Sequence, residues 1–167
     1  NHKQIECVTV DDGATVPVFG KPHVIGIANI RKISLEDDQI LIPQCNSSIG
    51  AQVKGLLKSL ARDHLAQASD HYAQRIGYTY QGLRLRDTRS RWGSCSSDGY
   101  LMYSWRLVMT PPHVLDYVAA HEVAHLVEMN HSKSFWSVVH DIYGDYERPR
   151  DWLRTHGNQL HRYDFNS

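Results

Sequence analysis

The sequence predicts an α+β fold in which a small antiparallel sheet packs against helices. Two patterns support this class. Apolar and polar residues alternate in residues 4–42 and again in residues 83–105, whereas most of the remaining chain repeats its apolar residues at three- and four-residue steps. No repeat, low-complexity segment or linker separates the patterns, so we expect one compact domain. Residues 1–46 would be its N-terminal strand region and residues 47–167 its core.

Composition narrows the classes of function. The chain has 167 residues, 41% hydrophobic and 22% charged, so it can bury a core without disulfides. Its 18 basic and 18 acidic residues balance, which does not favour a strongly basic nucleic-acid binder. No apolar run approaches the roughly 20 residues that span a bilayer, so no membrane contact is expected. Cys7, Cys45 and Cys95 form no CxxC pair, which favours a reducing, cytoplasmic location.

Short alternating bursts predict strands in residues 4–42. The bursts IECVTV, TVPVF, HVIGIANI and QILI each place apolar residues on one face. Turn-forming residues separate them at positions 11–13, 20–22 and 36–38. Together these signals predict the small antiparallel sheet.

A long amphipathic helix is predicted over residues 47–76. Ser47 or Ser48 would cap its start, and Gly77 would end it. A break near Gly55 stays open as an alternative, because glycine weakens a helix interior. The helical spacing is carried by Val53, Leu56, Leu57, Leu60, Leu65, Ala68, Tyr72 and Ile76.

A second strand region follows, and helices complete the chain. The predicted strands are residues 83–87, 91–95 and 100–105. Asp98 and Gly99 form a strong hairpin signal between the last two. The predicted helices are residues 113–129, 132–143 and 149–160. Pro112 suits the first turn of one helix, and Gly144 ends the next.

The first of these helices contains the motif His-Glu-Val-Ala-His. Residues four apart on a helix differ by about 400°, so His121 and His125 project from the same side, one turn apart. Two imidazoles at this pitch suit the tetrahedral nitrogen geometry of zinc. Glu122 is offset around the helix and can reach a water at the metal, which predicts a general base.

A catalytic zinc usually has three protein ligands, and His131 is the candidate for the third. In an uninterrupted helix His131 would lie about 9 Å beyond His125, out of reach of the same ion. The helix must therefore stop. Asn130 enters the left-handed conformation cheaply, and Ser132 is a good N-cap for the next helix, so the sequence predicts a bend at His131.

Chance explains the motif poorly. At this chain's own frequencies, HExxH would occur by accident in about 2% of such chains, and with the third histidine in roughly one or two in a thousand. Solvated or core histidines are the remaining alternative. The chain has 11 histidines in all, and we interpret His64 and His71 as packing or surface residues.

Three segments carry a resemblance to a known family. They read RWGSCSSDGYLMYSWRL, PPHVLDYVAAHEVAHLVEMNHSKSFW and a closing DWL, and they lie within residues 89–153. They resemble the YgjP-like zinc metallopeptidases, which are related to the SprT, Spartan and WLM peptidases of the minigluzincin type. The resemblance implies a zincin-like fold, one zinc ion per chain held by His121, His125 and His131, and Glu122 as the catalytic residue.

The histidine spacing also equals that of metzincins. Glu128, however, stands where their glycine would be, and no Met-turn is evident. We therefore favour the SprT and WLM side.

These ligands predict hydrolysis of peptide bonds in protein or peptide substrates. Zinc would lower the pKa of a bound water and polarise the scissile carbonyl, while Glu122 would take the water's proton and pass it to the leaving amine. Residues 100–105 would form the sheet edge along which an extended peptide adds as another strand, or else an ordinary core hairpin.

Other roles are assigned only as candidates. Substrate contacts are assigned to Tyr103, Trp105, Arg106 and His140. An oxyanion-stabilising role could fall to His140, Tyr143, Tyr103 or Arg106, although each also suits a structural role. The second nitrogens of the ligands could donate to Asp116, Glu128 or Asp141. Cys95 could be a redox switch or fourth ligand, but a small buried hydrophobe is the simpler interpretation.

Two other functions compete with a general peptidase. One is a DNA-associated protease of the SprT or WLM kind that binds single-stranded DNA. Its support is an arginine-rich segment interleaved with Trp92 and Tyr103: Arg75, Arg84, Arg86, Arg89, Arg91 and Arg106. The other is a catalytically silent scaffold in which zinc only ties helices together. The sequence does not indicate an oligomeric state.

Overall fold

The computed structural model describes residues 6–166 and confirms the α+β class. Within that range it has four α-helices, two 3-10 helices and nine short strands. Residues 4 and 5, where the predicted strand region begins, lie outside the described residues. None of the helices in the described part of the chain is long and apolar enough to cross a membrane.

The N-terminal strands form a mixed sheet. The first five strands are β1 (Val8–Thr9), β2 (Thr15–Val18), β3 (Lys21–Ala28), β4 (Ser34–Leu35) and β5 (Gln39–Pro43). The sheet order is β2-β3-β5-β4, and β3 and β5 run parallel. The expectation of a purely antiparallel sheet is wrong here, because the connection through β4 returns the chain before β5 begins. β1 pairs in parallel with β9 (Tyr163–Asp164) near the C-terminus.

The long helix α1 (Ile49–Ile76) is continuous. The Ser48 side chain accepts a hydrogen bond from the Ala51 N–H at 3.1 Å, and Gly77 ends the helix with φ of 72°. Both predicted caps are therefore confirmed. No break occurs at Gly55, which lies on the exposed side of the helix, where a Cβ would meet no atom within 4 Å.

The second sheet has one central strand and two edge strands. It contains β6 (Gly82–Arg86), β7 (Gly93–Cys95) and β8 (Tyr100–Ser104) in the order β6-β8-β7. β7 and β8 form the predicted antiparallel hairpin, whereas β6 runs parallel to β8. β8 is thus the central strand. The prediction that residues 100–105 form the open edge is wrong, because both sides of β8 are already paired.

Helices make up most of the rest. They are η1 (Trp105–Met109), α2 (Pro112–Ala124), α3 (Lys133–Tyr143), α4 (Glu147–His156) and η2 (Gly157–Arg162). Pro112 is at the first turn of α2, and the Ser132 side chain accepts a hydrogen bond from the Phe135 N–H at 3.3 Å. α2 ends before His125, earlier than predicted. Asn130 is not left-handed, since among the described non-glycine residues positive φ is found at Phe19.

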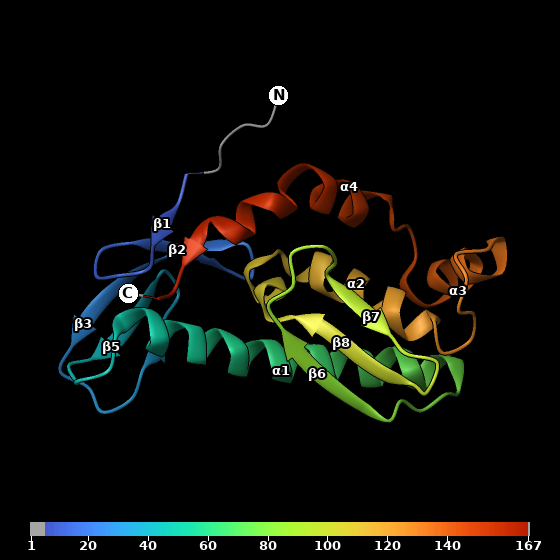
Figure 1. Ribbon diagram of the computed structural model, residues 1–167, viewed down its shortest axis with the longest axis horizontal. Helices are drawn as coiled ribbons and strands as arrows, with labels where there is room; N and C mark the ends of the chain where they lie inside the picture. The colour runs from blue at the N-terminus through green and yellow to red at the C-terminus, as the bar shows by residue number, and fades with distance from the viewer. Residues whose placement is uncertain (1–5, 167) are drawn as a thin grey trace.

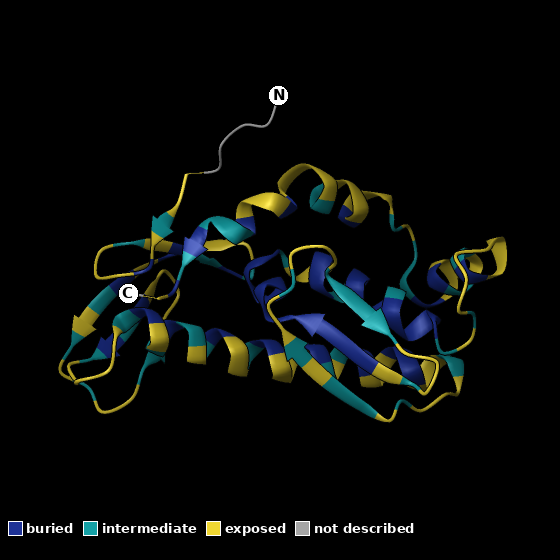
Figure 2. Cartoon of the chain, in the orientation of Figure 1, coloured by how far each residue is buried: buried dark blue, intermediate teal, exposed yellow. Residues whose placement is uncertain are grey.

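α1 organises the packing. Figure 1 shows the N-terminal strands gathered near the start of α1 and the second sheet over its far half. α1 packs against α2 and η1, and one apolar core joins residues of both sheets and the helices. Figure 2 shows the buried residues concentrated in α2, β8 and the inner face of α1. α2 therefore packs against both α1, which contributes buried residues, and β7.

Candidate metal centre

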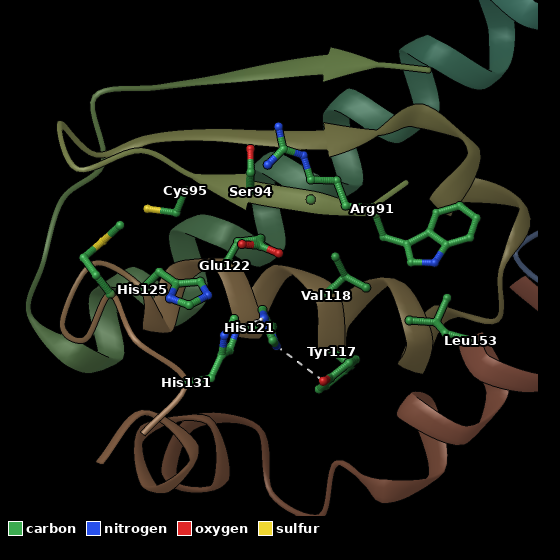
Figure 3. A pocket seen from close by; sticks show the side chains of 13 residues that line it. Arg91, Ser94, Cys95, Tyr117, Val118, His121, Glu122, His125, His131 and Leu153 are labelled. Atoms are coloured by element: carbon green, nitrogen blue, oxygen red, sulfur yellow. Dashed lines mark hydrogen bonds between the residues drawn. The ribbon is translucent and has the colours of Figure 1, made fainter. Parts of the chain in front are cut away.

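A pocket of about 500 Å³ opens between β7 and α2. Residues 91–95 form one wall, α2 forms the floor, and Leu153 of α4 closes one end (Figure 3). His121, Glu122, His125 and His131 all line this pocket.

The structure brings the three predicted ligands together. One ligand nitrogen from each of His121, His125 and His131 lies within 4.8 Å of the others. The Nε2 atoms of His121 and His131 are 3.3 Å apart. Among the described residues this is the one cluster of three or more histidine, cysteine or acidic side chains that could hold a metal ion.

The early end of α2 makes this convergence possible. Turn hydrogen bonds replace the helical ones, with the Leu126 N–H bonded to the Val123 carbonyl and the Val127 N–H to the Ala124 carbonyl. The chain then reverses before Ser132 starts α3. Helix termination was predicted, but the turn lies immediately after Ala124 and not at Asn130.

The outward nitrogens of two ligands have partners. His125 Nδ1 lies 3.0 Å from the Glu128 backbone carbonyl, so Nδ1 donates and Nε2 keeps its lone pair for a metal. His121 Nδ1 lies 3.4 Å from the Tyr117 hydroxyl. Glu128 thus acts through its backbone and not its carboxylate. Neither Asp116 nor Asp141 makes a hydrogen bond to these rings.

Burial keeps the imidazoles of His121 and His125 neutral. The pKa of His121 falls to about 3, chiefly because the ring is desolvated and then because other cationic groups lie nearby. Burial also lowers the pKa of His125. Phe135 and Trp136 enclose His121, with ring centroids 4.9 and 5.5 Å away. Neutral imidazole is the form that binds a metal, so His121 and His125 can act as donors at neutral pH.

Glu122 is buried beside the histidines without a partner. It is 6% exposed, and among the described residues none donates a hydrogen bond to its carboxylate. Burial raises the pKa of Glu122 to about 8, although the charge of Arg91 opposes the rise. Gly93 of β7 lies directly over it. A Cβ added there would come within 2.8 Å of Glu122 Cγ, so β7 can approach only because this residue is glycine.

The remaining candidate substrate residues do not converge on the pocket. Tyr103 is fully buried, and its hydroxyl bonds to Ser69 at 2.9 Å. Trp105 is 1% exposed and packs edge-on against Phe165. The assignment of Tyr103 and Trp105 to substrate contacts is corrected, because β8 is the central strand and both side chains belong to the buried core.

Arg106 is also a core residue. It is 7% exposed and forms an ion pair with Asp87 at 2.7 Å. Its Nη1 donates to the Leu160 and Tyr163 carbonyls at 2.8 and 3.1 Å. The guanidinium therefore fastens the C-terminal segment to the sheet and does not face substrate.

The two oxyanion candidates on α3, His140 and Tyr143, do not line the pocket. His140 is exposed and lines a separate groove that begins at His131. The Tyr143 hydroxyl donates to the His113 carbonyl at 2.9 Å.

The features taken as a DNA-binding surface are partly internal. Arg75 donates to the carbonyls of Asp141 and Ile142, and Arg106 and Tyr103 are buried. The Trp92 ring stacks on His161 with centroids 5.3 Å apart. Arg75, Arg84, Arg86, Arg89 and Arg91 are exposed, but Arg75 is engaged by the Asp141 and Ile142 carbonyls. The segment therefore lacks an exposed aromatic platform formed by Trp92 and Tyr103.

Cys95 lies on β7 in the pocket wall and is half-buried. It is not part of the three-histidine cluster. Burial raises the pKa of its thiol to about 11, with a further contribution from the charge of Glu122. The thiol is therefore protonated at neutral pH, as expected of a small apolar residue.

Sequence reasoning missed two residues of the site. Tyr117 stands four residues before His121, and this spacing could have placed it on the ligand face of the helix. Gly93 carried no comparable signal. Its importance comes from contact with Glu122, which lies far along the chain.

Comparison with known proteins gives one family match. A family model described as YgjP-like, metallopeptidase domain matches residues 3–156. Among curated proteins no match was found. Among solved structures, a metallopeptidase zymogen, Pyrococcus abyssi abylysin, is 21% identical with a TM-score of 0.49, covering 59% of this chain and 97% of that one.

Proposed function

The chain belongs to the YgjP-like metallopeptidase family, and from this premise we propose that it is a zinc-dependent peptidase acting on protein substrates. The observation that carries the proposal is the cluster of three histidine nitrogens beside a buried, unpartnered carboxyl group at the floor of a pocket. His121, His125 and His131 would hold one zinc ion, and Glu122 would act as the base.

The donor set fits zinc. Nitrogens bonded to zinc at about 2.0 to 2.1 Å lie about 3.3 to 3.4 Å apart in a tetrahedron. The Nε2 atoms of His121 and His131 are already 3.3 Å apart. When bound, the ion would polarise the scissile carbonyl and acidify water.

Glu122 supplies the proton-transfer group. Its carboxyl group makes no hydrogen bond among the described residues, so in the ionised form, which a neighbouring cation favours, either oxygen is free to accept a proton from water. It lies on α2 directly after His121, and Gly93 leaves room above it. We propose that Glu122 takes the proton of the attacking water and delivers it to the leaving amine.

The free edge of β7 would bind the substrate backbone. The Ser104 N–H bonds to the Trp92 carbonyl, and the Ser96 N–H bonds to the Tyr100 carbonyl. In an antiparallel pair the backbone groups alternate, so those of Gly93 and Cys95 point away from β8. An extended peptide could pair with them as an added strand.

The end of the pocket away from the histidines would receive a substrate side chain. It is apolar, with Val118 and Leu153 near each other in Figure 3, and Trp92 also lines the pocket. We propose that an apolar residue of the substrate lies there.

Metal content and turnover test the proposal together. Wild type purified without added metal should contain about one zinc per chain and should hydrolyse an unfolded protein, whereas Glu122→Gln should keep zinc but lose at least about 100-fold in kcat/KM. His131→Ala should lose most of the zinc. His71→Ala is the matched control, because His71 is an exposed histidine of α1 outside the cluster, and it should retain both.

The competing outcomes are separable. Zinc in the wild type with no hydrolysis would favour the scaffold function. Hydrolysis at the native rate by Glu122→Gln would require a mechanism in which Glu122 is not the base. DNA dependence and a cytoplasmic location stay predictions. The DNA alternative requires salt-sensitive binding to single-stranded DNA that is lost when Arg89 and Arg91 become glutamate.

A further inference from the structure

We infer that Tyr117 is a positioning residue that orients His121 toward the metal. Its hydroxyl would fix the rotation of the His121 ring by accepting a hydrogen bond from Nδ1 when Nε2 binds the metal. The inference rests on the metal site of the proposed function, but it concerns metal affinity and not hydrolysis. It assigns a task to a buried residue that the proposed mechanism does not otherwise use.

The geometry places Tyr117 and the metal position on opposite sides of one ring. The Tyr117 hydroxyl lies 3.4 Å from His121 Nδ1, and His121 Nε2 lies 3.3 Å from His131 Nε2. Tyr117 stands one helical turn before His121 on α2, so the two side chains share a face. Figure 3 shows the tyrosine below the histidine, with the contact drawn between them.

The tautomer decides the direction of this hydrogen bond. If Nε2 is the metal ligand, the neutral ring carries its hydrogen on Nδ1. Nδ1–H then donates to the Tyr117 oxygen. A phenol can donate or accept, so metal binding at Nε2 sets the tautomer, and the Tyr117 oxygen then accepts the Nδ1 hydrogen and holds the ring in that orientation.

Hydrogen-bond requirements give an independent reason. Tyr117 is 5% exposed, and buried hydroxyl groups normally have a partner. Among the described residues, His121 is the one hydrogen-bond partner of this hydroxyl. His125 differs, because its Nδ1 is held by the Glu128 backbone carbonyl, which no side-chain substitution removes. Of the two, only the His121 support can be tested by changing one side chain.

The phenol ring is itself held in place. Tyr143 packs edge-on against it with centroids 5.7 Å apart, and Tyr146 stacks on it at 6.4 Å. Tyr146 in turn stacks on Trp136 at 4.9 Å, and the Arg150 guanidinium lies 4.8 Å from the Trp136 ring. Contacts from α3 and α4 thus restrict the positions the hydroxyl can adopt.

Tyr117→Phe tests the inference by removing only the hydroxyl. The metal-free protein would be titrated with zinc against a competing chromogenic chelator, and zinc affinity should fall at least about tenfold. Tyr143→Phe is the matched control, since it removes a neighbouring phenol hydroxyl whose partner is the His113 carbonyl and not a ligand. It should bind zinc as the wild type does. Thermal unfolding of the metal-free variants would verify that both fold.

The outcomes divide clearly. Wild-type affinity in Tyr117→Phe would overturn the inference, and so would an equal loss in both variants, because that loss would reflect general packing. Tyr117→Leu removes ring and hydroxyl together, and a tenfold loss in it alone, with Tyr117→Phe unchanged, would also overturn the inference. Failure of the wild type to bind zinc would overturn it together with the proposed metal site. If the wild type binds zinc but does not hydrolyse protein, and Tyr117→Phe lowers zinc affinity, the inference is supported and the proposed catalysis is contradicted.

Discussion

Two ionisable side chains of this protein are almost equally buried, yet their surroundings are opposite. Arg106 is 7% exposed and Glu122 is 6% exposed. The Arg106 guanidinium donates to the Asp87 carboxylate and to the backbone carbonyls of Leu160 and Tyr163. Glu122 accepts no hydrogen bond from any described residue and lies at the floor of a pocket.

This difference separates a structural charge from the group that we propose acts in catalysis. A buried charge is tolerated when hydrogen bonds and an opposite charge replace the lost water, as at Arg106. Without such partners the group shifts its pKa, as Glu122 does, and remains free to exchange a proton. The sequence presents both residues as candidates for the site. Only their partners assign Arg106 to the core.

The largest expected difference between Arg106 and Glu122 is in the free energy of unfolding when each side chain is replaced by a neutral one. Arg106→Leu should lower the free energy of unfolding by about 3 kcal/mol, because Asp87 and two carbonyls lose their donor. Glu122→Gln should leave the stability of the metal-free protein unchanged or higher. Chemical denaturation of both variants measures this. Equal losses would contradict the distinction.

Gly93→Ala should disturb the chemical site through backbone contact. The added Cβ would lie 2.8 Å from Glu122 Cγ and 3.0 Å from the Met102 carbonyl, so stability should fall by about 1 to 3 kcal/mol. Hydrolysis should fall more than tenfold as Glu122 is displaced. The control is Gly55→Ala, where nothing lies within 4 Å. It should raise stability by up to about 1 kcal/mol, and a loss there would show that α1 needs its glycine.

Tyr103→Phe removes a second buried polar group of the core that has a hydrogen-bond partner. The Tyr103 hydroxyl and Ser69 are hydrogen-bonded at 2.9 Å and both residues are fully buried. Removing the phenol oxygen leaves the serine unpaired, so the free energy of unfolding should fall by about 1 kcal/mol, with kcat/KM unchanged. A selective loss of turnover would instead return Tyr103 to the substrate site.

The smallest expected effect is the pH dependence at Asp87. Burial raises the pKa of its carboxyl, but the hydrogen bond and charge of Arg106 outweigh burial, and the pKa lies below its ordinary value. Its stabilising contribution is therefore complete above the unfolded pKa of about 4 and is lost as pH falls through the folded pKa. The stability gap between wild type and Asp87→Asn should be constant above pH about 5 and should narrow below about 4. A gap that widens on acidification would contradict this sign.

Local patterns predicted much of the chain correctly. Ser48 and Gly77 cap α1, Ser132 caps α3, and the β7–β8 hairpin turns where Asp98 and Gly99 predict it. Each of these depends on a hydrogen bond or a backbone conformation within a few residues. The long-range pairing was not predictable in the same way, so the parallel β3–β5 and β6–β8 ladders were missed.

By itself the sequence determined the metal-binding pattern. The spacing of His121 and His125 places two imidazoles one helical turn apart, which is a local property of the backbone, and a stop before His131 was also predictable, although its position after Ala124 was not. Tertiary structure decided everything that depends on partners distant in the chain. It made β7 the free edge, brought Gly93 against Glu122, and enclosed Arg106 with Asp87 and the C-terminal carbonyls. Burial and pairing are properties of the folded chain, so residue type alone cannot distinguish the proposed catalytic carboxyl group from a structural charge.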